Sequence, residues 1–294
     1  MQRRYTQVAT LGMTLGPQGF LGIPSIGDPW FVATDGNDSQ GTGAHDPTKP
    51  LLTITQALAL AAAGDVVYVA PGTYAESFTI SQSHLTIVGM GSLGSVIIQP
   101  VATTAVAVTV TGQRVTLVNL DVSAAETAAL IGVLVNGDGF VARQCKFETY
   151  DNAGTALKFL PSAVWGSTAS LFKVIDCEFA WCATGINFFK ATSTCTQGRV
   201  TRCWFHNCSA AAIAENSANA VRNLVVEDCT FDDMEDGTAP TKYIQLPGSS
   251  DLGTGIVTRC SFPTALAGGL NLVSTGIHWV CNYHTGGVSN GQPS

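Results

Sequence analysis

A six-residue pattern of apolar and polar positions recurs along the second half of the chain: valine, two variable residues, cysteine, one variable residue and phenylalanine. Cysteine and phenylalanine are two positions apart, so in a strand both side chains share one face. The valine is three positions from the cysteine, and this change of parity predicts a sharp bend between two short strands. The pattern or a near variant contains Cys145, Cys177, Cys203, Cys229 and Cys260, with Asp176, Arg202, Asp228 and Arg259 at four of the bends; LVNLDV (Leu120, Val122) and HWVCNY (Cys281, Tyr283) fit the same frame.

A second pattern lies upstream of these cysteines and has two apolar residues at alternate positions, which predicts a strand with one row of side chains inside and one outside. The variable spacing between the cysteines fits strands of fixed length joined by turns of different lengths. The two patterns together predict an all-β fold, a right-handed single-stranded parallel β-helix. The second pattern comprises Val133/Val135, Leu157/Phe159, Ile186/Phe188, Ile244/Leu246 and Leu270/Leu272, with Ile213/Glu215 imperfect; its outward residues are Lys158, Asn187, Ala214, Gln245 and Asn271.

Residues 30–76 predict a cap for this stack. A strand at Trp30 is followed by an Asp/Gly-rich loop, and then by a short helix that Thr53 or Thr55 caps and Gly64 ends. A strand over 65–69 and the turn Pro-Gly-Thr-Tyr come next. This order resembles the opening of pectate-lyase-like β-helix proteins, in which the helix covers the open N-terminal end of the coils. The resemblance extends over residues 30–283 and implies the fold.

Three segments are therefore expected. Residues 1–29 form an extended Gly/Pro-rich arm, which either packs on its own β-helix or docks on another subunit. Residues 30–284 form the parallel β-helix domain, and residues 285–294 form a flexible tail.

The composition narrows the function classes. The chain is 46% hydrophobic and 12% charged, with a net charge of −7 and no basic face for nucleic acid. No apolar run is long enough to span a membrane, and the N-terminal residues lack the uninterrupted apolar centre of a secretory signal. We expect neither nucleic acid nor membrane as partner, and we expect assembly in a cytoplasm, where the nine cysteines stay reduced.

Three constellations suggest a ligand site, and each has a structural interpretation that we prefer. The pairs Cys177/Cys182 and Cys203/Cys208 have four residues between partners, wider than usual zinc spacings, so we interpret them as rows of a core ladder. The loop around Asp35 lacks the glycine offset and final glutamate of an EF-hand and is interpreted as a turn rather than a calcium site. DDMEDG supplies Asp232, Asp233, Glu235 and Asp236, near Glu215 or Asp251; we interpret it as a solvated turn, with an acid pair as the alternative.

The outward residues Lys146, Glu178, Trp204, Thr230 and Ser261 are chemically mixed, and the histidines show no metal or triad spacing. We therefore assign no catalytic, cofactor-binding or metal-binding residue and no cofactor.

A looser resemblance concerns function. An arm that ends at Ile23–Gly27, followed by a strand and a D-G-N-D loop, is similar to β-helix proteins of tailed bacteriophages, whose short arms attach to the virion. The resemblance implies a non-enzymatic virion structural protein, a capsid decoration that binds the major capsid protein or other virion subunits through residues 1–29, and it allows a homo-trimer. The alternatives are a carbohydrate-active tailspike-like depolymerase or polysaccharide lyase, and a glycan-binding adhesin that uses Trp165, Trp181 or Trp204.

Overall fold

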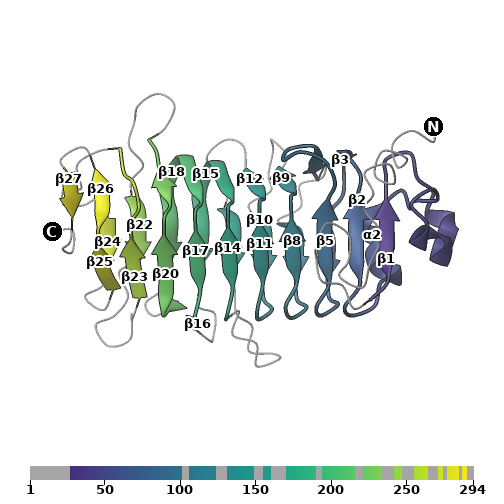
Figure 1. Ribbon diagram of the computed structural model, residues 1–294, viewed down its shortest axis with the longest axis horizontal. Helices are drawn as coiled ribbons and strands as arrows, with labels where there is room; N and C mark the ends of the chain where they lie inside the picture. The colour runs from purple at the N-terminus through teal and green to yellow at the C-terminus, as the bar shows by residue number, and fades with distance from the viewer. Residues whose placement is uncertain are drawn as a thin grey trace, which may run out of the picture.

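The computed structural model describes twelve stretches of the chain and shows a rod of stacked strands (Figure 1). All strand pairs are parallel except the last pair, β26 and β27, which confirms the predicted parallel β-helix. Within the described residues, no helix is long and apolar enough to cross a membrane. The described stretches are 27–100, 106–123, 131–148, 155–159, 170–189, 194–215, 221–233, 242–246, 255–263, 271–273, 277–284 and 287–289.

The first sheet stacks ten short strands, one above the next. In its middle strands, alternate residues are buried, as expected where one face of the strand contacts the core. Its strands are, in order, β1 (Pro29–Val32), β2 (Val66–Val69), β5 (Thr86–Gly89), β8 (Thr116–Val118), β11 (Val141–Arg143), β14 (Lys173–Ile175), β17 (Arg199–Thr201), β20 (Leu224–Glu227), β23 (Gly255–Thr258) and β25 (Ile277–Val280).

The second sheet has two rows of short strands joined by two long strands, β15 (Glu178–Phe188) and β18 (Trp204–Glu215). One row contains β3 (Gly72–Tyr74), β6 (Val96–Ile98), β9 (Asp121–Ser123), β12 (Lys146–Glu148) and β21 (Thr230–Phe231). The other contains β4 (Phe78–Ile80), β7 (Val106–Val110), β10 (Ile131–Val135), β13 (Thr155–Phe159), β22 (Lys242–Leu246) and β24 (Asn271–Val273). Two small pairs complete the fold: β16 (Cys195–Thr196) with β19 (Val221–Arg222), and β26 (Asn282–His284) with β27 (Gly287–Ser289).

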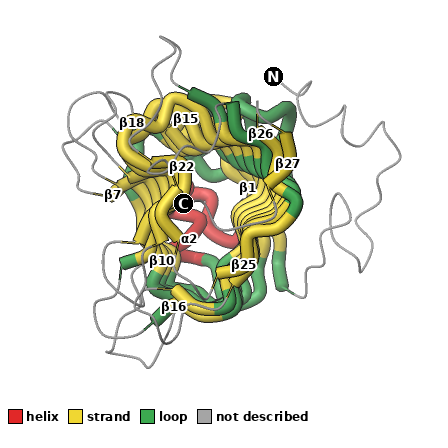
Figure 2. The backbone as a smooth tube through the Cα atoms, turned by 90° about the vertical axis from the view of Figure 1, so that its left-hand side faces the viewer, coloured by secondary structure: helices red, strands yellow, loops and turns green. Residues whose placement is uncertain are grey.

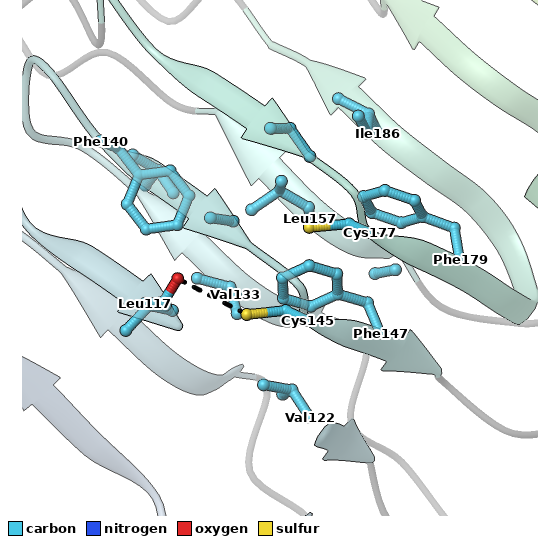
Figure 3. Packing of buried hydrophobic residues seen from close by; sticks show 14 of the residues in the cluster. Leu117, Val122, Val133, Phe140, Cys145, Phe147, Leu157, Cys177, Phe179 and Ile186 are labelled. Carbon is cyan, nitrogen blue, oxygen red and sulfur yellow. Dashed lines mark hydrogen bonds between the residues drawn. The ribbon is translucent and has the colours of Figure 1, made fainter. Parts of the chain in front are cut away.

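The core contains the predicted ladder. Figure 3 shows Cys145 and Cys177 on successive coils, beside the stacked rings of Phe147 and Phe179. The phenylalanine stack continues through the later coils, with ring centroids 4.7 to 5.1 Å apart as far as Phe262. Several thiols also donate a weak hydrogen bond to a carbonyl of the preceding coil, as Cys145 does to the Leu117 oxygen at 3.6 Å.

The bends lie where the change of parity predicts them. Asp176, Arg202, Asp228 and Arg259 have φ between 51° and 55°, the left-handed region, and each directly precedes a buried cysteine. One left-handed residue turns the chain sharply and shifts the side-chain alternation by one position.

The predicted positions of Cys281, Tyr283 and Asn271, near the C-terminal end, are wrong by one residue. Tyr283, expected in the core, lies opposite Ser261 and is exposed. Thr258 pairs with Val280, so Cys281 takes the bend position and is exposed, while Asn282 occupies the cysteine position. The Asn282 amide satisfies the buried backbone there: it accepts from the Cys260 N–H at 2.9 Å and donates to the Val257 carbonyl at 2.9 Å. Similarly, Gln245 pairs with Leu272, so Leu272 rather than Asn271 takes the register position beside Gln245. β27 also lies within the segment predicted to be a flexible tail.

The predicted cap helix is α2 (Ile54–Leu60), and it follows the 3₁₀ segment η2 (Asp38–His45). Figure 2, which looks along the stack, shows α2 across the centre of the coils. The Thr53 side chain accepts from the Gln56 N–H, while Glu76 accepts the Ile54 and Thr55 N–H groups at 2.8 and 2.9 Å. These contacts satisfy amides that a helix N-terminus leaves unpaired.

Candidate functional site

A line of polar residues follows the outward side of four neighbouring strands, β9, β12, β15 and β18, which lie side by side along the top of Figure 1. The strand register sets Asp121 opposite Lys146, Lys146 opposite Glu178, and Glu178 opposite Trp204. Residues directly opposite in adjacent strands lie close enough for their side chains to interact. We call the surface made by these four residues, together with Glu148 and His206, the polar face.

Asp121 is the most unusual residue of the polar face. It is only 6% exposed, and its Oδ1 atom has no hydrogen-bond partner among the described residues. Burial, and secondarily the nearby charge of Glu148, raises the pKa of Asp121 to about 7. The side chain therefore keeps a proton up to near-neutral pH, so it has the property required of a general acid.

Lys146 and Glu148 form an ion pair beside this acid. The Lys146 Nζ atom lies 2.8 Å from the Glu148 Oε2 atom, and the Glu148 side chain is buried. Burial acts to lower the pKa of Lys146, but the hydrogen bond and the charge of Glu148, with those of Asp121 and Glu178, raise it overall. Lys146 is therefore a permanent cation whose charge Glu148 neutralises.

The aromatic end of the polar face is held in place by hydrogen bonds. The Trp204 Nε1–H donates to Asp232 at 2.6 Å, and the indole stacks on the His206 ring with centroids 4.0 Å apart. The His206 Nε2–H donates to Glu178 at 3.1 Å, while the Asn207 amide donates to Nδ1 at 3.1 Å. Trp204 remains 44% exposed, so its ring is available to a ligand.

Sequence reasoning had placed Lys146, Glu178 and Trp204 in one outward row, and the register confirms this. It missed Asp121 and Glu148, which bring carboxyl groups to that row. A signal was present for Asp121, because LVNLDV fits the coil frame and Asp121 stands between its Leu and Val, the position of Lys146. Glu148 lies one position after Phe147, the residue at which the six-residue pattern ends.

Residues of the candidate metal sites have other contacts. Asp38, in the loop around Asp35, accepts the N–H groups of Leu52 and Thr53 at 2.8 and 3.0 Å, as expected for the turn interpretation. Cys182 and Cys208 stack with sulfur atoms 3.3 Å apart in the buried core, as predicted for a second row. Among the described residues, no group of three or more histidine, cysteine or acidic side chains is arranged to hold a metal ion.

The acidic segment around Asp232 is only partly described. Asp232 accepts from Trp204, and Asp233 accepts from the Tyr243 hydroxyl, so neither is simply a solvated turn residue. Glu215 is buried, opposite Phe188. Glu235, Asp236 and Asp251 lie outside the described residues, as does Trp165.

Comparisons with known proteins bear on the fold of the chain. Residues 34–90 match a family model described as a protein of unknown function, DUF1565. No curated protein sequence matches the chain. Among solved structures, the pectate lyase Pel9A superposes with a TM-score of 0.68 at 16% identity, over 87% of this chain and 69% of the lyase.

Other similar structures include the pectin methylesterase PemA from Erwinia chrysanthemi, with a TM-score of 0.57 at 13% identity over 90% of this chain and 91% of that enzyme. A rhamnogalacturonan lyase superposes with a TM-score of 0.58 at 15% identity, over 80% of this chain and 68% of that one. At these identities the likeness establishes the fold: the chain is a pectate-lyase-like right-handed parallel β-helix.

Proposed function

We propose that the protein is carbohydrate-active and that a polysaccharide lies along the polar face, where a glycosidic bond is hydrolysed. The observation that carries this proposal is Asp121, a buried carboxyl with an unpaired oxygen atom and a pKa of about 7. Burying a polar group without a hydrogen-bond partner lowers the stability of the folded protein, so folding alone does not favour it. A general acid, in contrast, works best with a pKa near the operating pH.

The strand positions of Asp121 and Glu178 suit hydrolysis. Asp121 and Glu178 are two strands apart, with Lys146 between them. Two strand spacings place their backbones about 9–10 Å apart. In glycoside hydrolases that use one carboxyl as acid and the other to activate water, the two carboxyls are about 6.5–9.5 Å apart, a range that residues two strands apart can reach. Asp121 would give its proton to the departing glycosidic oxygen, while Glu178 would take a proton from the attacking water.

The similar structures support a role in carbohydrate chemistry. Their names describe a pectate lyase, pectin methylesterases and a rhamnogalacturonan lyase. A parallel β-helix offers such chemistry a long, straight outer surface, and its exposed rows change without disturbing the core ladder.

The test is release of reducing ends from a panel of polysaccharides by the full-length protein. We expect Asp121→Asn to abolish turnover while binding persists, because the amide is similar in shape but cannot donate a catalytic proton. Asp176→Asn, on the sheet surface at a bend, is the matched control and should retain full turnover. Absence of turnover on every polysaccharide, with the wild-type protein folded, would refute hydrolysis.

The second candidate function is the non-enzymatic structural one: a decoration of the capsid surface of a tailed bacteriophage, attached through residues 1–29. Charged pairs across the coils favour a rigid body of this kind. Arg202 donates to both oxygens of Asp176 at 2.6 and 2.9 Å, and Arg259 does the same to Asp228 at 2.7 and 2.9 Å. These bidentate ion pairs connect the bends of neighbouring coils on the outside, while the phenylalanine rings stack in the core.

The structural candidate is tested by quantitative mass spectrometry of purified virions, with the major capsid protein as reference. Tens to hundreds of copies would support a capsid decoration, and deletion of residues 1–29 should then remove the protein from the particle. A handful of copies would indicate a tail position and favour the hydrolase, whereas absence from virions would refute the structural candidate.

A further inference from the structure

The charges on the polar face differ from those expected of a surface that binds an acidic polysaccharide. Asp121, Glu148 and Glu178 supply three carboxyl groups, and Asp232 adds a fourth beside the tryptophan. Lys146 is the lysine of this face, and its ammonium group already pairs with Glu148 at 2.8 Å. A polyuronate carries one carboxylate on each sugar, and bringing it here would add like charges beside a lysine that Glu148 already neutralises.

The basic residues of neighbouring bends do not change this balance. Arg202 and Arg259 lie at bends between the first and second sheets. Arg202 forms an ion pair with Asp176, and Arg259 forms one with Asp228. Arg199, on the first sheet, is likewise paired with Glu227 at 2.8 Å. Each of these three arginines is thus already paired with an acidic partner.

The aromatic part of the polar face suits an uncharged sugar ring. Trp204 is fixed at two points, by the hydrogen bond to Asp232 and by stacking on His206, yet remains 44% exposed. A fixed, partly exposed indole stacks on the C–H face of a pyranose with little loss of side-chain entropy. Its acidic neighbours, Glu178 and Asp232, would also attract an ammonium group if the sugar carried one.

A second observation indicates that a ligand completes this surface. The Asp121 Oδ1 atom and the Ser123 hydroxyl, in adjacent outward positions of β9, are both buried and have no hydrogen-bond partner within the described part of the chain. A sugar hydroxyl both donates and accepts, so it matches a carboxyl–hydroxyl pair of this kind. A carboxylate ligand could only accept, so it would offer this pair no donor, and above about pH 7 it would meet the carboxylate form of Asp121 unfavourably.

We infer that the polar face binds a polysaccharide without carboxylate groups, either neutral or amino-bearing, rather than the polyuronates named for the similar structures. This inference rests on the proposed function, because it specifies the substrate class of the same site. A lyase acting by β-elimination needs a uronate next to the bond that breaks, so a substrate without carboxylates also favours hydrolysis over elimination.

The test is affinity electrophoresis of the full-length protein in gels that contain a neutral β-glucan, chitosan or polygalacturonate of matched length. We expect retardation by the first two and none by polygalacturonate. Higher salt should weaken binding to chitosan and leave binding to the β-glucan unchanged, because screening acts on charge pairs only. Glu178→Gln should weaken the chitosan complex selectively.

Variants separate the site from general surface effects. Trp204→Ala should weaken binding to both favoured glycans about tenfold, the loss expected for one aromatic stacking contact. Thr230→Ala, in the same outward row one coil further on, is the matched control and should bind like the wild-type protein. Circular dichroism of each variant verifies that the β-helix is folded.

The outcomes distinguish the two proposals. Binding to polygalacturonate alone, or to all three glycans equally, would overturn the inference about substrate class while the proposed carbohydrate function stands. Binding to none of the three by folded protein would overturn both. Binding to neutral or amino-bearing glycan that does not respond to Trp204→Ala would place the glycan elsewhere and overturn the inference.

Discussion

Replacement of Asp121 by asparagine should change the pH dependence of the protein's stability. Burial raises the pKa of Asp121 to about 7 from an ordinary value of 3.8, so between these pH values the folded protein holds a proton that the unfolded chain releases. Stability is therefore lost as the pH rises through this window. Asparagine resembles the protonated acid at every pH, so the variant lacks the loss.

The size of the effect follows from the same shift. Each pKa unit corresponds to about 1.36 kcal/mol, so a shift of about 3 units gives about 4 kcal/mol. At pH 4 the wild-type protein and Asp121→Asn should have similar free energies of unfolding. At pH 8 the variant should be more stable by up to about 4 kcal/mol, because it avoids a buried negative charge beside Glu148.

Guanidinium chloride unfolding followed by tryptophan fluorescence at pH 4, 6 and 8 measures this difference. Asp35→Asn is the control, since Asp35 is exposed in a turn. This variant controls for the change of aspartate to asparagine itself. A difference between wild-type and Asp121→Asn that stays constant from pH 4 to 8 would refute the reasoning, because Asp121 would then have an ordinary pKa.

Three further predictions concern the scaffold. Phe205→Ala should lower the free energy of unfolding by about 3–5 kcal/mol because it removes a buried ring from the stack. Trp204→Ala, one position away and facing outward, should lower it far less. Equal losses in chemical unfolding would contradict the assigned faces. In the native protein, Ellman's reagent should titrate one fast thiol, Cys281, and Cys281→Ser should remove it; several fast thiols would contradict the buried ladder. Glu76→Ala should destabilise the cap helix by about 1 kcal/mol, seen as faster hydrogen exchange of its amides, and unchanged exchange would show that the carboxylate does not cap it.

The coil ladder could be predicted because its signal is local. Cys203 and Phe205 are two residues apart, the bend at Arg202 shifts the alternation by one position, and the same arrangement recurs in each coil. Core packing repeats because every coil meets the same neighbours above and below, so the residue types repeat as well. The cap helix was equally predictable from Thr53 and the apolar positions that follow it.

The errors arose where local pattern and stacking disagree. Cys281 matched the pattern by residue type, yet Thr258 pairs with Val280 and the register places Asn282 in the core. An amide satisfies the buried backbone there as a thiol does elsewhere. Such a choice depends on contacts with the coil below, which one sequence segment does not reveal.

The polar face could not be predicted for a related reason, and that reason bears on its function. Inward positions are constrained by the stack, but outward positions vary freely, as Thr230 and Ser261 show in the row that contains Glu178. A small hydroxyl residue would therefore be accepted at Asp121 without harm to the fold. Instead the chain holds there a buried carboxyl with an unpaired oxygen atom, which destabilises the folded protein at neutral pH. A residue that lowers the stability of the folded protein, at a position where the fold does not need that residue, is expected to have a function. Asp121→Asn that is both more stable at pH 8 and inactive on glycan would show this exchange directly.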